Sequence, residues 1–488
     1  MANKTRVSGF ERAFNPRTIS IVGVSRTDKK QHPGGTGLGF FRRLRQLGFK
    51  GRIYPVNPKA EEIEGVRSYP SVVSVPEPLD LAIITVPAKS VPQVLKDCIA
   101  AGVLNVHICT SGFSETGEEE GKRLEETARE IALDGGLRVI GPNSMGLQVP
   151  SAKISTFDDM PLVNGPVSFV SQSGGHAGAF LRFGPDQGIG FSKIISYGNA
   201  LTLDAPDFLE YLGSDPETRV ICLYIEGIRD GRKLIRLVRE INTRKPIIIW
   251  KGGLTDSGAR AAASHTGSLA GDSQVWDAFF KQTGAIRVSS IEEMAEVVSA
   301  LLYLRPSVSR GVAVLGGGGG NNVATGDICA QEGIELPLLS SETQTKLNDF
   351  ISLVNQSVTN PLDAPSLFTD ASHLRQAIEL LTADPGVHVI ILNLNVGLFG
   401  ITPPKLMRQV RKCICDFARE TPGGKPIVAA IPHQGTGVAW EFAQKLIKEG
   451  IPSYRSLRRA CRALNRFTRY NEYVSQVSGT CTDDLQDE

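Results

Sequence analysis

The segment PVSFVSQSGGHAGAF, residues 166–180, passes from an apolar run through a turn of serine and glycine into a stretch rich in alanine and glycine. A short apolar run without polar alternation is typical of a strand that is buried on both faces of a parallel sheet. Glycine directly after such a strand is typical of the ligand-binding turns of α/β proteins. The segment therefore predicts a strand, a ligand-binding turn and the start of a helix.

The same pattern recurs along the whole chain. Apolar runs that are followed by a small residue and a helix-like segment occur at residues 18–25, 51–56, 81–87, 103–112, 138–144, 191–199, 219–227, 245–253, 311–320, 388–395 and 425–435. Strands that alternate with helices predict βα units and parallel sheets. We therefore expect an α/β protein built from parallel sheets.

At 488 residues, the chain is too long for a single hydrophobic core. The segment at residues 166–180 and the strands after it resemble the segment at residues 311–327 and its later strands. This repetition predicts two flavodoxin-like domains behind a separate Rossmann-like domain. The expected domains are residues 1–150, 151–307 and 308–470, followed by an acidic tail, residues 471–488, which we expect to be disordered.

Composition narrows the classes of partner. The formal net charge is +2, which provides no broad field for nucleic acid or for a membrane surface, so we expect small ligands or a protein partner. The N-terminus has no apolar core for export, and no apolar run is long enough to span a membrane. The eight cysteines are scattered without paired spacing, which indicates reduced thiols in a cytoplasmic protein and no metal site.

The first apolar run ends at Gly23 and leads through a loop with basic and glycine residues to a helix near Gly37. Backbone N–H groups in such a turn can receive a phosphate group. The G-x-G-x-x-G spacing is absent, and Lys59 follows the second run where a dinucleotide-binding enzyme needs an acidic residue. A cation there favours a nucleotide with an extra phosphate, and a purely structural turn is the alternative.

The turn after the strand at residue 166 contains Ser171, Ser173 and Gly174. Hydroxyl groups, glycine and a helix N-terminus together favour a cradle for an oxyanion or a phosphate. A hydrolase nucleophile elbow has glycine at the position of Ser171, so the pattern argues against that enzyme class. A plain turn without a ligand is the other alternative.

One histidine, His265, stands in ARAAASHTGSLAG, residues 259–271, among small side chains. A neutral imidazole is a nucleophile near pH 7, and small neighbours leave room for a bulky anion. These features favour a phosphoryl carrier, with a surface or core histidine as the alternative. Glu226 ends another predicted strand, where it can accept a hydrogen bond from that ring or simply be a solvated loop residue.

In their order along the chain, these motifs resemble the α component of the nucleoside-diphosphate-forming acyl-CoA synthetases, which are relatives of succinyl-CoA synthetase. The resemblance covers roughly residues 10–460. It rests on GVSR (23–26), YPVNPK (54–59), VPA (86–88), TSGFSE (110–115), GPNSMGL (141–147), SQSG (171–174), LYIEG (223–227) and SHTGSLAG (264–271).

The resemblance implies a CoA-binding Rossmann-like domain and two flavodoxin-like ligase domains. It also implies the reaction carboxylate + CoA + ATP ⇌ acyl-CoA + ADP + phosphate, through an acyl phosphate and a phosphohistidine. His265 would carry the phosphoryl group, Glu226 would bind the ring, and Ser171, Ser173 and Gly174 would hold phosphate. The CoA site would be lined by Gly23, Ser25, Lys59, Pro87, Ser111 and Asn143.

The chain departs from the family pattern in two places. No nucleotide-grasping domain follows residue 470, so we expect a separate ATP-grasp β subunit that binds ATP and Mg²⁺, in an α₂β₂ hetero-oligomer or with an α dimer. Residues 198–204 read GNALTLD where family members read close to GNKADVD, a change that can reshape the acyl site. The alternatives are a noncatalytic CoA-sensing protein on the same fold and an NAD-dependent oxidoreductase, which Lys59 argues against.

Overall fold

The computed structural model describes residues 9–25, 36–258, 260, 272–316, 319–352, 354, 356–394, 404–421, 424–432 and 437–479. The chain divides into two compact units. The first comprises the residues up to 185 together with 189–291, and the second comprises 186–188 together with the residues from 292 onward.

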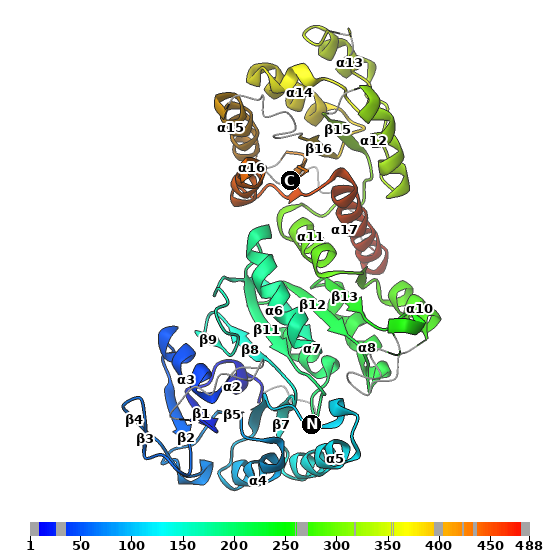
Figure 1. Cartoon of the computed structure of the whole chain (residues 1–488). Helices are drawn as coiled ribbons and strands as arrows, with labels where there is room; N and C mark the ends of the chain where they lie inside the picture. The colour runs from blue at the N-terminus through cyan, green and yellow to red at the C-terminus, as the bar shows by residue number, and fades with distance from the viewer. Residues whose placement is uncertain are drawn as a thin grey trace. The chain divides into compact units, whose positions relative to one another are not determined.

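The first unit begins with a five-stranded parallel sheet in the order β2-β1-β5-β6-β7 (Figure 1). Its strands are β1 (Thr18–Val22), β2 (Arg52–Val56), β5 (Leu81–Ile84), β6 (Asn105–Ile108) and β7 (Arg138–Ile140). The helices around it are α2 (Glu11–Phe14), α3 (Gly37–Gln46), α4 (Val91–Ala100) and α5 (Glu119–Asp134), and a small hairpin is formed by β3 (Glu62–Ile63) and β4 (Val66–Arg67).

Both faces of this sheet are buried, as the apolar runs require. Leu81 and Ile83 of β5 belong to one hydrophobic cluster with residues of α3. Ala82 and Ile84 of the same strand belong to another cluster, with residues of α4 and α5. Because consecutive side chains of a strand point to opposite faces, a strand covered on both sides is apolar throughout rather than at alternate positions.

The first unit also contains a seven-stranded sheet in the order β14-β13-β12-β10-β11-β8-β9. Its strands are β8 (Gly146–Val149), β9 (Ile154–Ser155), β10 (Asn164–Ser171), β11 (Phe191–Ser196), β12 (Val220–Ile225), β13 (Ile247–Lys251) and β14 (Ile286–Val288). The helices beside it are α6 (Gly174–Phe183), α7 (Ala205–Ser214), α8 (Gly231–Asn242) and α10 (Ser273–Thr283). β10 to β14 are parallel, whereas β8 runs antiparallel to β11 and β9 antiparallel to β8.

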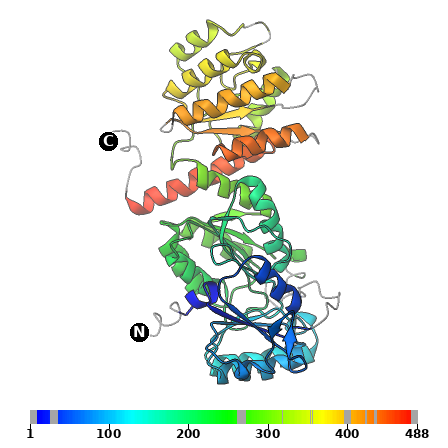
Figure 2. The same cartoon turned by 90° about the vertical axis from the view of Figure 1, so that its left-hand side faces the viewer.

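The second unit contains a parallel sheet in the order β15-β16-β17-β18, with helices beside it (Figure 2). The strands are β15 (Val312–Leu315), β16 (Val389–Asn393), β17 (Ile427–Ala430) and β18 (Ser453–Tyr454). The helices are α11 (Ile291–Tyr303), α12 (Gly319–Gln331), α13 (Ser341–Asn348), α14 (Ala371–Ala383), α15 (Pro404–Glu420), α16 (Gly437–Lys448) and α17 (Leu457–Ser478). Side chains of β15, β16 and β17 again divide between two hydrophobic clusters, one on each face.

The parallel α/β architecture is confirmed, and each of the twelve predicted runs contains a strand. The predicted start of disorder at residue 471 is wrong, because α17 continues to Ser478. Asn471 is buried, and Glu472 forms an ion pair with Arg310 at 2.7 Å, which holds this turn of the helix in place. Residues 480–488 lie outside the described part of the chain.

All seven cysteines in the described part of the chain are free thiols. Within the same residues, no helix combines the length and the hydrophobicity that crossing a membrane requires.

Candidate active site

The strand orders of the first unit point to two ligand sites. β1 lies between β2 and β5, and β10 lies between β11 and β12, so the chain changes direction across each sheet beside its first parallel strand. In open parallel sheets, ligands bind at the carboxyl ends of the strands, at the point where the strand order reverses. The sites are therefore expected beyond the ends of β1 and β5 and beyond the ends of β10 and β12.

At the first switch point, two glycines allow neighbouring segments of the backbone to approach each other closely. Gly23 follows β1 with φ +98°, and a Cβ on it would lie 2.9 Å from Thr85 Oγ1. A Cβ on Gly37, the first residue of α3, would lie 2.7 Å from the same oxygen and 3.1 Å from the carbonyl oxygen of Gly23. The N-terminus of α3 therefore lies against the end of β1, which is an arrangement that suits a phosphate-bearing ligand such as CoA.

Hydrogen bonds also join the turns after β1 and β2. The side-chain amide of Asn57 donates to the carbonyl of Val24 at 2.6 Å, beside Ser25. The backbone N–H of Lys59 donates to the side-chain oxygen of Asn57 at 2.8 Å, and the Lys59 side chain is exposed. The cation and the hydroxyl that the sequence proposed for CoA thus lie on neighbouring turns.

The remaining proposed CoA residues follow the other strands of the same sheet. Pro87 follows β5 and Ser111 follows β6. Asn143 follows β7 with φ +54°, and its N–H donates to the carbonyl of Thr110 at 2.9 Å, next to Ser111. All six residues proposed for CoA therefore lie at the carboxyl edge of one sheet, although they are scattered in the sequence.

The cradle lies at the second switch point. Ser173 caps α6, because its Oγ accepts a hydrogen bond from the backbone N–H of His176 at 3.3 Å. The hydroxyl of Ser171 is buried and donates to the carbonyl of Ser173 at 2.6 Å, so it orders the turn. A Cβ on Gly174 would lie 2.4 Å from Met145 Cγ. A tight turn at a helix N-terminus fits a phosphate group, because backbone N–H groups and the positive end of the helix dipole meet there.

Glu226 lies next to this cradle. It directly follows β12, the neighbour of β10, and only 7% of it is exposed. Its backbone N–H donates to Gln172 Oε1 in the cradle turn at 2.9 Å. Its carboxylate accepts a hydrogen bond from the hydroxyl of Tyr224 at 3.1 Å. The structure thus brings together the cradle and the acidic residue that the sequence proposed separately.

Four residues of this site were not predicted from the sequence. The ring of His176 packs on Tyr224 and Trp250, with centroid distances of 4.3 and 4.5 Å. Burial lowers the pKa of His176, while the charge of Glu226 acts in the opposite direction. Lys251 ends β13 and donates to the carbonyl of Glu226 at 2.8 Å. The signal in the sequence was their position, in the first turn of a helix or at the end of a strand next to proposed site residues.

His265 and its neighbours, residues 261–271, lie outside the described part of the chain. The structure does describe where their segment is attached. It follows β13, whose last residue Lys251 is paired with Ile225, and it precedes α10, which begins at Ser273. The segment that carries His265 therefore begins beside Glu226.

A loop of the seven-stranded sheet reaches the five-stranded sheet. Asn199 lies in the altered stretch at residues 198–204, and its side-chain amide donates to Glu115 Oε2 at 2.7 Å and to Glu125 Oε2 at 2.8 Å. The amide of Asn143 lies 3.4 Å from Asn199 Oδ1. One proposed CoA residue is therefore in contact with the stretch that departs from the family pattern.

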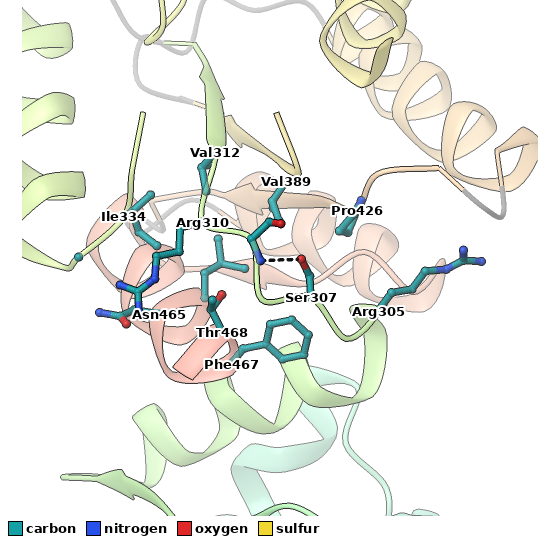
Figure 3. Close-up of a pocket in the computed structure, with 13 residues that line it drawn as sticks. Arg305, Ser307, Arg310, Val312, Ile334, Val389, Pro426, Asn465, Phe467 and Thr468 are labelled. Carbon is teal, nitrogen blue, oxygen red and sulfur yellow. Dashed lines mark hydrogen bonds between the residues drawn. The ribbon is translucent and has the colours of Figure 1, made fainter. Parts of the chain in front are cut away.

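A separate cavity lies in the second unit, between the connection that leads to β15 and the helix α17 (Figure 3). It is lined by Arg310, Asn465 and Thr468 among others, and its volume is about 20 Å³. That volume admits about one water molecule, so this cavity is no site for a substrate.

Three family models match the chain in sequence. A CoA-binding domain matches residues 17–150, a succinyl-CoA ligase-like flavodoxin domain matches residues 164–301, and a ligase-CoA domain matches residues 312–465. These matches follow the order of the three main sheets.

Individual relatives agree with the family models. The α subunit of acetate–CoA ligase (ADP-forming) II from Pyrococcus furiosus is 39% identical over 90% of this chain and 93% of its own length. The α subunit of acetate–CoA ligase (ADP-forming) I from the same organism is 36% identical over 96% and 99%. Acetate–CoA ligase (ADP-forming) I from Archaeoglobus fulgidus is 37% identical over 95% of this chain but only 64% of its own length.

A solved structure has the same fold. The dinucleotide-forming acetyl-coenzyme A synthetase 1 of Candidatus Korarchaeum cryptofilum, in complex with phosphate and ADP, is 33% identical and matches with a TM-score of 0.84 over 98% of this chain and 99% of that chain. Identity at this level over nearly the full length of both chains establishes common ancestry. The chain belongs to the family of ADP-forming acyl-CoA synthetases related to succinyl-CoA ligase.

Proposed function

We propose that this chain is the CoA-binding, phosphohistidine-bearing subunit of an ADP-forming acid–CoA ligase. The observation that carries the proposal is the joint placement of the cradle and Glu226 at one switch point, in a chain that closely resembles named α subunits of such ligases. The noncatalytic alternative is disfavoured, because these relatives are enzyme subunits and the proposed catalytic residues are all present in the sequence.

In the direction of ATP synthesis, we assign the following chemistry. Phosphate attacks the carbonyl carbon of the acyl-CoA, a C–O bond forms, the C–S bond breaks, and CoA leaves as its thiolate. A ring nitrogen of His265 then attacks the phosphorus of the acyl phosphate, an N–P bond forms, and the P–O bond breaks to release the carboxylate. The phosphohistidine finally transfers its phosphoryl group to ADP: a terminal phosphate oxygen of ADP attacks the phosphorus, a P–O bond forms, and the N–P bond breaks to give ATP and free His265.

The residues of the chain have separate roles in this scheme. Ser173 and Gly174 present the N-terminus of α6 to phosphate, and Ser171 keeps the turn in that shape. Fixed N–H groups at this position stabilise the negative charge that develops during phosphoryl transfer. Glu226 accepts a hydrogen bond from the ring of His265, which leaves the other ring nitrogen free to act as the nucleophile. The CoA site is assigned to Gly23, Ser25, Lys59, Pro87, Ser111 and Asn143.

A second subunit completes the enzyme. We assign ATP, ADP and Mg²⁺ to a separate ATP-grasp β subunit, in an α₂β₂ hetero-oligomer or with an α dimer. Two considerations support this assignment. The Pyrococcus relatives are named as α subunits, and the Archaeoglobus relative is a longer chain of which this one covers 64%. We also assign the enzyme to the cytoplasm, and we assign to it three domains that follow the order of the three main sheets.

The test is direct labelling. The chain, purified with its ATP-binding partner, is incubated with Mg²⁺ and ATP that carries a radioactive γ-phosphate. In a second arm, the chain alone receives acetyl-CoA and radioactive phosphate. We expect acid-labile label on the chain, and none on a His265→Ala variant. Equal labelling of the His265→Ala variant would overturn the assignment of the carrier, and CoA binding with no labelling in either arm would favour a noncatalytic protein.

A further inference from the structure

Lys251 is a cation in an unusual environment. It is the last residue of β13, and only 5% of it is exposed. Lysine is rarely this buried unless its charge is paired, and the charge that faces it is that of Glu226. Trp276 covers it from α10, with Nζ 5.5 Å from the ring centroid. Burial lowers the pKa of Lys251 to about 8, although the charge of Glu226 acts against that shift.

The backbone and side chain of Glu226 are held from the ends of three neighbouring strands. Gln172, after β10, accepts the Glu226 N–H at 2.9 Å. Lys251, on β13, donates to the Glu226 carbonyl at 2.8 Å. Tyr224, on β12, donates to the carboxylate at 3.1 Å. Of these three groups, only Lys251 carries a charge that both orients the turn and attracts an anion.

The same lysine also binds the beginning of the segment that carries His265. Its Nζ donates to the carbonyl of the next residue, Gly252, as well as to that of Glu226. The N–H of Gly252 in turn donates to the carbonyl of Ile225 at 2.9 Å. These hydrogen bonds therefore join the Glu226 turn to Gly252, the first residue of the connection towards His265.

We propose that Lys251 is a positioning residue that fixes the Glu226 turn against Gly252, the first residue after β13, and thereby fixes the orientation of the Glu226 carboxylate. The inference rests on the proposed function. A buried ammonium is not needed for stability alone, because well-packed apolar residues often serve as well in such places. The Lys251 ammonium instead fixes the orientation of the Glu226 turn. Small errors in the orientation of reacting groups have large effects on rate.

The chain offers a matched control at the opposite end of the same strand. Lys245 precedes β13, and its Nζ also donates to two backbone carbonyls, those of Leu212 at 2.9 Å and Asp215 at 2.6 Å. Burial lowers the pKa of Lys245 as well. Its removal therefore reproduces the loss of a partly buried lysine, but at a distance of a whole strand from Glu226.

The experiment measures phosphohistidine formation in a single turnover, with the partner subunit and γ-labelled ATP. We expect Lys251→Met to slow the step by about 10-fold or more. The ATP concentration that gives half of the maximal single-turnover rate should change by less than about threefold. Lys251→Arg should recover part of the rate because it keeps the charge. Lys245→Met should stay within about twofold of the parent. A Lys251→Met variant that stays within about twofold as well would overturn the proposal.

A pH profile tests the proposal even if Lys251→Met does not fold. The ammonium is the form that donates, so the parent rate should fall as the pH rises through about 8, between about pH 7 and about pH 9.5. Lys251→Arg should remove that decline, since arginine stays protonated. A flat parent profile, or an unchanged decline in Lys251→Arg, would overturn the proposal. If the parent itself is not labelled, the proposed function fails instead.

Discussion

The side-chain amide of Asn199 donates to the carboxylate of Glu125 at 2.8 Å, and so joins a loop of the seven-stranded sheet to a helix of the five-stranded sheet. The same amide donates to Glu115 at 2.7 Å. Asn199 is buried, so water cannot readily replace it. These two side-chain bonds add to backbone bonds that join the same stretch to the turn after β7, from the N–H of Asn199 to the carbonyl of Pro142 at 3.1 Å and from the N–H of Leu201 to that of Gly141 at 2.9 Å.

We expect Asn199→Ala to lower the free energy of unfolding by about 1–3 kcal/mol, because it removes the donor to Glu115 Oε2 and one of the donors to Glu125 Oε2, which also accepts from Ser114. Urea unfolding followed by circular dichroism measures the change. Gln93→Ala is the control, since Gln93 makes a comparable bond to Asp97 at 2.9 Å on the surface. That variant should change stability by less than about 0.5 kcal/mol. Equal losses of stability in the two variants would show that the bonds of Asn199 contribute no more than a hydrogen bond on the surface.

The turn after β1 requires glycine at position 23 because its φ is positive and because there is no room for a Cβ. Two substitutions can separate these requirements. Gly23 and Gly65 both have positive φ, +98° and +80°, but only Gly23 has atoms within 4 Å of the position of a Cβ. Either substitution by alanine should cost about 1 kcal/mol of stability through backbone strain. Only Gly23→Ala should weaken CoA binding, by about 10-fold or more, because crowding displaces the turn. Titration calorimetry with CoA checks this, and unchanged affinity of Gly23→Ala would remove the turn from the CoA site.

The cap of α6 should matter for phosphoryl transfer beyond its effect on the helix. Ser173→Ala and Ser340→Ala each remove an N-cap hydroxyl, from α6 and α13, where it accepts at 3.3 and 3.2 Å. Each should cost about 1 kcal/mol of stability. Ser173→Ala alone should slow phosphohistidine formation, by about 100-fold. If both variants are phosphorylated at the rate of the parent, the cap has a structural role only.

Stability of the second unit should depend on pH through Glu296. Burial raises its pKa to about 7, against the effect of Arg459, which donates to it at 2.7 Å. The folded state therefore binds this proton more tightly than the unfolded chain, whose Glu titrates near about 4.3. The resulting stabilisation is complete below about pH 4.3 and is lost as the pH rises through about 7, by at most about 1.4 kcal/mol per pH unit.

Glu296→Gln should remove this decline, and urea unfolding at several pH values between about 5 and about 8 measures it. Glu342→Gln is the control, because Glu342 is exposed, pairs with Lys346 at 2.6 Å, and has a lowered pKa. A decline of the same slope in Glu296→Gln would assign it to other groups.

The sequence predicts the architecture well because strands that are covered on both faces must be apolar throughout, and each of the twelve runs contains one. The hairpin of β8 and β9 was not predicted, since its strands are short and lack such a run. The last turns of α17 were not predicted either. Their sequence is polar, and they are held in place by two tertiary contacts that leave no pattern in it, the burial of Asn471 and the ion pair of Glu472.

The site is predictable only in part. Turns at the ends of strands are visible as glycine and serine after apolar runs, which is how Gly23, Ser173 and Glu226 were found. Packing between separate strands leaves no such signal. His176 and Lys251 lie far apart in the sequence, and only the parallel register of β10, β12 and β13 places both beside Glu226.

The pairing of β8 with β11 determines where this chain can be divided. Ile195 lies opposite Leu147, and Ser196 opposite Gly146, so β8 is part of the ligase sheet although the CoA-binding family model extends to residue 150. A chimaera cut at residue 150 would exchange an inner strand of the recipient for a foreign one and break a ladder of hydrogen bonds. A junction ahead of Gly146 would keep the β8–β9 hairpin in the seven-stranded sheet, and the junction would then lie in the loop between β7 and β8.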